Sequence, residues 1–89
     1  METMSAARFL RIRHGVTLRE LADAAGVSVQ YMSEIELNES RRTKGAERLT
    51  RKAFETVITQ RGENAKRLAE AFAANRDALF SMIEEDANV

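Results

Sequence analysis

Two helix signals separated by only three residues constrain this chain more than any other feature. Residues 17–20 form a capping box, in which the Thr17 hydroxyl can accept from the Glu20 amide and the Glu20 carboxylate can reach back to the Thr17 amide. An apolar stripe at i, i+3, i+4 and i+7 follows, and Gly26 ends this helix. Ser28 is the next cap, so we expect a second helix after a sharp turn that needs the positive φ of glycine.

Caps and periodicity predict five helices in all, and the composition agrees. The chain of 89 residues has no proline, four glycines and 31% charged residues, which favours an all-α fold. We expect one domain over residues 1–89, with a core at 5–45 and C-terminal helices at 43–85. The predicted helices cover residues 5–14, 17–26, 29–37, 43–62 and 63–85, and the last is the longest. Asn38 is expected to end the third helix in the left-handed conformation.

Charge is distributed unevenly along a chain that is neutral overall. Residues 1–52 contain ten Lys or Arg and seven Asp or Glu, whereas residues 53–89 contain four and seven. Six of the basic residues lie within 41–52, beside a single acid. This asymmetry indicates either a face that binds a polyanion or a solvated basic loop and helix end, and the run alone does not decide between them.

Several function classes are excluded or disfavoured by what the sequence contains. Cysteine is absent, so disulfides, thiolate metal sites and cysteine catalysis are excluded. There is also only one histidine. With no glycine-rich phosphate loop either, we expect a non-enzymatic protein without cofactor or metal. No apolar run reaches the about 18 residues of a membrane span, so we expect a cytoplasmic, nucleoid-associated protein rather than a membrane protein.

Two helices joined by a tight turn form a helix-turn-helix motif. Residues 17–37 resemble the helix-turn-helix of the Xre/Cro family. The resemblance covers about residues 5–45 and rests on Glu-Leu-Ala at 20–22, Gly-Val-Ser at 26–28 and Ser-Glu-Ile-Glu at 33–36. It implies a lambda-repressor-like fold and a bacterial or phage transcriptional regulator, acting as a repressor on double-stranded DNA. Residues 29–37 correspond to the recognition helix, whose N-terminal part enters the major groove.

The resemblance also assigns roles to individual residues. Arg11 and Glu36 correspond to a structural ion pair that joins the first helix to the third. Leu18, Asn38 and Thr43 stand where the family often has Gln, Gly and Pro. Leucine cannot make the phosphate contact of the glutamine, so this contact is either lost or provided by Arg19 instead. The expected base-reading residues are Val29, Gln30, Tyr31, Ser33 and Glu34. The expected phosphate contacts are Thr17, Arg19, Ser28, Arg41, Arg42 and Lys44.

A second copy of the chain is expected, because one recognition helix reads only half of a site. The apolar stripe of the last predicted helix suits a homodimer on a palindromic operator, through Leu68, Phe72, Leu79 and Ile83. The same stripe could instead pack on the chain's own core. Two alternatives to a phage-type regulator stay open: a helical protein-interaction module, and an autoregulating antitoxin whose C-terminal helix binds a partner protein.

Overall fold

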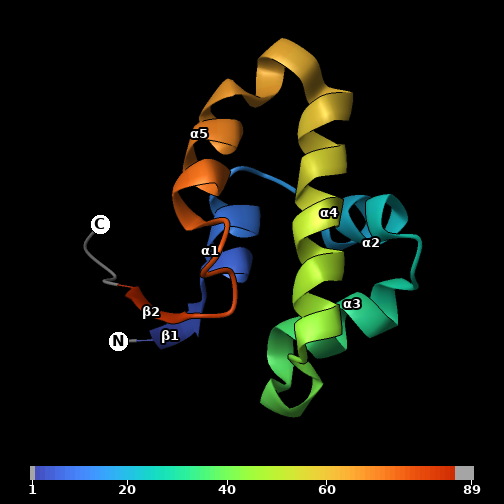
Figure 1. Cartoon of the computed structure of the whole chain (residues 1–89), viewed down its shortest axis with the longest axis vertical. Helices are drawn as coiled ribbons and strands as arrows, with labels where there is room; N and C mark the ends of the chain where they lie inside the picture. Colours follow the sequence, from blue (N-terminus) through green and yellow to red (C-terminus); the bar gives the residue numbers. More distant parts are fainter. Residues whose placement is uncertain (1, 86–89) are drawn as a thin grey trace.

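The computed structural model describes residues 2–85, which are mostly helical (Figure 1). In chain order the elements are β1 (Glu2–Ser5), α1 (Ala6–Arg13), α2 (Leu18–Ala25), α3 (Val29–Leu37), the 3-10 helix η1 (Glu39–Arg41), α4 (Lys44–Arg61), the 3-10 helix η2 (Gly62–Ala65), α5 (Lys66–Asn75) and β2 (Met82–Glu85). The helix α4 packs against α2, and α5 returns beside α1, so that α4 stands at the centre of the molecule (Figure 1). No helix among these residues is long and apolar enough to cross a membrane.

Four of the five predicted helix starts are confirmed by their caps. The hydroxyls of Thr17, Ser28 and Thr43 accept from the amides three residues later, at 3.0, 3.0 and 3.1 Å. Ser5 caps α1 in the same way at 3.2 Å. Each cap satisfies an amide that the first turn of a helix leaves without an intrahelical partner, which is why these local signals predict the starts correctly.

The turn between α2 and α3 is closed by Gly26. Its φ of 73° and ψ of 29° are left-handed, and a side chain there would be strained. The amide of Gly26 donates to Asp23 O at 3.2 Å, and the amide of Val27 donates to Ala22 O at 3.0 Å. This is a Schellman closure, which lets α3 begin with only three residues between it and α2.

The end of α3 differs from the prediction. Asn38 has φ −121° and ψ 109°, an extended conformation, and no residue other than glycine has positive φ in the described part of the chain. Its side-chain oxygen instead accepts from the amide of Ser40 at 3.1 Å and caps η1. The expectation of a left-handed Asn38 is therefore wrong, because its side chain starts the next helical turn.

The predicted helix over residues 63–85 is also wrong in its extent. The elements α4, η2 and α5 make a helical segment of 32 residues, but the chain bends at Gly62, whose φ of 59° and ψ of −130° suit glycine alone. The helix α5 ends at Asn75, and turns over residues 76–81 lead into β2. An apolar repeat cannot show where a helix gives way to a strand whose hydrogen-bond partners lie at the other end of the chain.

Those partners are residues of β1, so the fold is not purely α-helical. The two strands pair antiparallel, with Met4 opposite Ile83 and Ser5 opposite Met82. Figure 1 shows β1 and β2 side by side, although they are far apart in the sequence. The amides of Ala6 and Ala7 extend the pairing to the carbonyls of residues 81 and 79, so the sheet is continuous with the start of α1.

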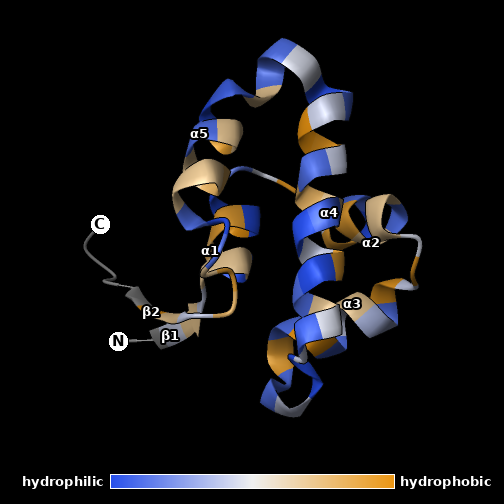
Figure 2. Ribbon diagram, viewed as in Figure 1, coloured by the Kyte–Doolittle hydropathy of each residue, from blue (hydrophilic) through white to orange (hydrophobic). Residues whose placement is uncertain are grey.

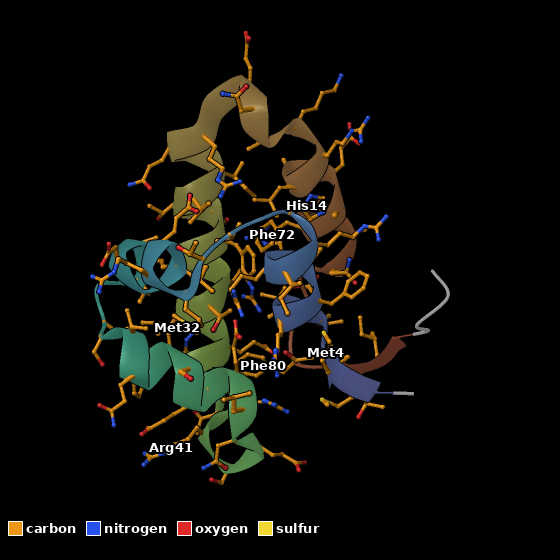
Figure 3. The ribbon with its side chains drawn as sticks, turned by 180° about the vertical axis from the view of Figure 1, so that it is seen from behind. Met4, His14, Met32, Arg41, Phe72 and Phe80 are labelled. Atoms are coloured by element: carbon orange, nitrogen blue, oxygen red, sulfur yellow. The ribbon has the colours of Figure 1, made fainter. Side chains whose placement is uncertain are left out.

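The apolar stripe of α5 is buried within the chain itself. Phe72 stacks on Phe54 of α4, with ring centroids 5.7 Å apart, and Leu68 and Leu79 belong to the same core cluster. Figure 2 shows apolar residues on the facing sides of the helices, and Phe72 lies inside the molecule in Figure 3. These three side chains are therefore not available for the dimer contact predicted for them, and the open alternative of packing on the chain's own core describes them. Ile83 is half-buried in β2.

Candidate nucleic-acid interface

The helix α3 has one face fixed in the core and one face open. Met32, Ile35 and Glu36 are buried. Gln30 and Tyr31 are exposed on the other side, Tyr31 at 39%. A short helix held in this way presents a rigid row of side chains to a ligand, because its position does not depend on the ligand.

A buried ion pair fixes α3 to α1. Arg11 Nε donates to Glu36 Oε2 at 2.6 Å, and Arg11 Nη2 donates to Oε1 at 3.0 Å, a bidentate arrangement. Arg11 Nη1 also donates to the carbonyl of Val16 at 3.0 Å, which ties in the loop before α2. The structure thus brings together the two residues that the resemblance pairs. Arg8 Nε lies 3.9 Å from the same carboxylate.

The five residues expected to read bases do not share one environment. Gln30 and Tyr31 are exposed, Ser33 and Glu34 are half-exposed, and Val29 is half-buried against the core. Glu34 Oε2 lies 3.7 Å from Arg41 Nε, so a cation accompanies the one carboxylate in this set. Gln30, Tyr31 and Glu34 therefore have the best access to a base edge, and Val29 has less.

The N-termini of α2 and α3 offer amides and hydroxyls to an anion. Thr17 and Ser28 are both exposed, and each hydroxyl already accepts from its own helix. Each hydroxyl can still donate its own proton to an oxygen, as a phosphate contact needs. Arg19 is exposed in the first turn of α2. The structure thus leaves these three expected phosphate contacts accessible.

The basic residues after α3 divide into two groups. Arg41 and Lys44 are exposed, and Figure 3 shows Arg41 pointing outward beside α3. Arg42 turns back instead: its Nε donates to Ile35 O at 3.0 Å and its Nη2 donates to Glu36 O at 2.7 Å. From the sequence, Arg41 and Arg42 are both expected to contact phosphate. In the structure, Arg42 instead donates to carbonyls at the C-terminal end of α3.

Comparison with known proteins agrees with this geometry. Residues 8–51 match the helix-turn-helix family, over a range that contains most of α1, all of α2 and α3, and the first part of α4. Residues 8–51 are an Xre/Cro-type helix-turn-helix domain. A domain of this family implies DNA binding, and the family is typically non-enzymatic. No curated protein and no solved structure matches the chain.

One contact of the helix-turn-helix domain with the rest of the chain has no sequence signal. Arg61, the last residue of α4, donates through Nη2 and Nε to the carboxylate of Glu20 at 2.6 and 2.9 Å, and to the carbonyls of His14 and Gly15. The Arg61 guanidinium lowers the pKa of Glu20, with a smaller contribution from the amide of Thr17. The two residues are 41 positions apart, so only the fold brings them together.

Proposed function

We propose that this protein is a sequence-specific transcriptional regulator, a repressor that inserts α3 into the major groove of double-stranded DNA. The observation that carries the proposal is the open face of α3, with Gln30 and Tyr31 exposed and Glu34 beside them on a helix fixed by the Arg11–Glu36 pair. A major groove about 12 Å wide admits an α-helix and displays a different pattern of donors and acceptors for each base pair.

The side chains on this face suit particular base edges. The amide of Gln30 can make two hydrogen bonds to adenine N6 and N7, and the carboxylate of Glu34 can accept from cytosine N4. The half-buried Val29 can contact a thymine methyl group. Tyr31 and the hydroxyls of Thr17 and Ser28 can donate to phosphates, together with Arg19, Arg41 and Lys44.

A homodimer on a palindromic operator is part of the proposal. Half-sites one helical turn apart lie about 34–36 Å from centre to centre. The whole molecule measures 33 × 28 × 21 Å, so two copies side by side fit this spacing. The dimer contact must use a surface other than Leu68, Phe72 and Leu79, since these residues are buried in the monomer.

Selection from a random duplex library tests the proposal. The purified protein is mixed with the library at about 0.15 M salt, where non-specific binding is only about 10⁻⁴–10⁻⁶ M, and bound duplexes are sequenced. We expect a palindrome whose half-sites are about one turn apart. An enriched single half-site would remove the dimer and keep sequence-specific binding. No enrichment by the folded protein would contradict the proposal and favour a protein-interaction module.

A further inference from the structure

The C-terminal end of α3 lacks the usual means of closing a helix. The last four carbonyls of a helix have no intrahelical donor, and a left-handed residue or a basic side chain in the last turn commonly satisfies them. Asn38 is extended, and the last turn of α3 holds no basic residue. The amide of Asn38 donates to Glu34 O at 2.8 Å, which leaves the carbonyls of Ile35 and Glu36 for a donor from elsewhere.

Arg42 supplies that donor. Its Nε and Nη2 atoms reach the carbonyls of Ile35 and Glu36 at 3.0 and 2.7 Å. A planar guanidinium presents its donors in a fixed fork, so two adjacent carbonyls are held at once, and its charge lies at the negative end of the helix dipole. The third nitrogen, Nη1, donates to the sulfur of Met82 in β2 at 3.3 Å, and this contact also helps to fix the guanidinium.

We infer that Arg42 is a positioning residue for α3 in DNA reading, whereas its neighbour Arg41 contacts phosphate. The inference rests on the proposed function, since it concerns how the recognition helix is held. Arg42 and the Arg11–Glu36 pair hold the same last turn of α3, one through the backbone and the other through a side chain. Without the two hydrogen bonds from Arg42, the last turn of α3 frays. Glu34 belongs to that turn, so its side chain shifts as well.

Arg41 provides a control with the same side chain at the adjacent position. Its side chain is 56% exposed, and its partner among the described residues is Glu34, at 3.7 Å. Neither Arg41→Lys nor Arg42→Lys changes the net charge of the protein. A lysine can replace an arginine as a point charge on phosphate, but one ammonium cannot reproduce the two parallel bonds of a guanidinium.

The first test measures binding of both lysine variants to the selected duplex and to an unrelated duplex. We expect Arg42→Lys to lower specific affinity about tenfold, the loss typical of one hydrogen bond to a charged group, and to leave non-specific affinity and the salt dependence unchanged. Arg41→Lys concerns a phosphate contact, so any loss of affinity should be the same for the selected and the unrelated duplex. Arg41→Met should reduce the slope of log K against log salt by about 0.9 for each phosphate that the variant no longer neutralises. The matching variant Arg42→Met is measured in the same way. The inference would be overturned if Arg42→Lys kept wild-type specific affinity and Arg42→Met reduced the slope of log K against log salt, because Arg42 would then act as a phosphate contact.

The second test needs no DNA. Amide hydrogen exchange of Asn38, whose amide closes the last turn of α3, should accelerate in Arg42→Lys and stay unchanged in Arg41→Lys. Exchange in α2 serves as the internal reference for a folded protein. If the wild type selects no duplex but exchange accelerates, the proposed function fails and the helix cap stands. If the wild type selects a duplex but Arg42→Lys changes neither exchange nor affinity, the positioning role is wrong.

Discussion

The helices α3 and α5 are similar in length and differ in how they use their two faces. The apolar stripe of α5, with Leu68 and Phe72, is buried against α4 and α1 within the chain. The helix α3 also buries one face, but Gln30 and Tyr31 are exposed on its other face. An apolar stripe shows that a face will be covered without showing what covers it. From this difference we infer that α5 stabilises the core, whereas the exposed face of α3 is the one that recognises DNA.

The largest effect is expected from the buried face of α5. Phe72→Ala should lower the free energy of unfolding by about 3–5 kcal/mol, because it removes a stacked ring from the core. Urea unfolding at two protein concentrations measures it, and the loss should be the same at both. Ala73→Ser, on the exposed side of α5, should change stability by no more than about 0.5 kcal/mol. A Phe72→Ala protein that keeps its stability but loses self-association would reverse our assignment of α5.

The buried side of α3 should respond nearly as strongly. Glu36→Gln leaves the Arg11 guanidinium largely buried without its counter-charge, which should cost about 3 kcal/mol of unfolding free energy. Thermal or urea unfolding measures the loss. Glu34→Gln, two residues away on the half-exposed side, is the matched control and should be close to neutral. Equal losses in the two variants would mean that the two faces of α3 do not differ as described.

The open side of α3 should show the opposite behaviour, with a change in recognition and not in stability. Gln30→Ala should remove about 1–3 kcal/mol of discrimination at one base pair in each half-site, the range for a bidentate contact. Its unfolding free energy should stay within about 0.5 kcal/mol of wild type, since Gln30 is exposed. Binding to all single-base variants of the selected duplex gives the first quantity. An unaltered base preference would remove Gln30 from the set of reading residues.

The smallest effect concerns the link between α4 and α2. The hydrogen bonds from Arg61 lower the pKa of Glu20 in the folded protein, below the about 4.3 of an unfolded glutamate. The folded state then binds fewer protons, so this pair stabilises the fold above about pH 4.3 and loses its effect as the pH falls through the lower folded pKa. Because both side chains are partly exposed, the contribution should be below about 1 kcal/mol. Glu20→Gln should flatten the acid side of the stability curve, and a curve parallel to wild type would contradict the assignment.

Local signals predict the helix-turn-helix part well. The caps at Thr17, Ser28 and Thr43 and the turn at Gly26 each depend on atoms within a few residues, so their sequence pattern contains the whole cause. The strand at residues 82–85 depends on pairing with residues 2–5, and nothing near either segment reveals it. For that reason the apolar repeat at the C-terminus predicts one long helix where the chain forms a shorter helix and a strand.

The candidate site shows the same division between local and distant causes. The exposure of Gln30 and Tyr31 follows from the period of α3 and could be predicted. The different roles of Arg41 and Arg42 could not, because they depend on the missing left-handed residue at Asn38 and on the placement of Met82. The pair of Arg61 with Glu20 likewise depends on how α4 crosses α2.

The backbone amide resonances of the protein, followed by NMR while the selected duplex is added, show directly which face binds DNA. We predict that the largest shifts occur at Gln30, Tyr31 and Glu34 and at the N-termini of α2 and α3. The amides of α5 at Leu68 and Phe72 should change little. Large shifts along α5 with none in α3 would contradict the account, because the duplex would then bind to the supporting side of the molecule.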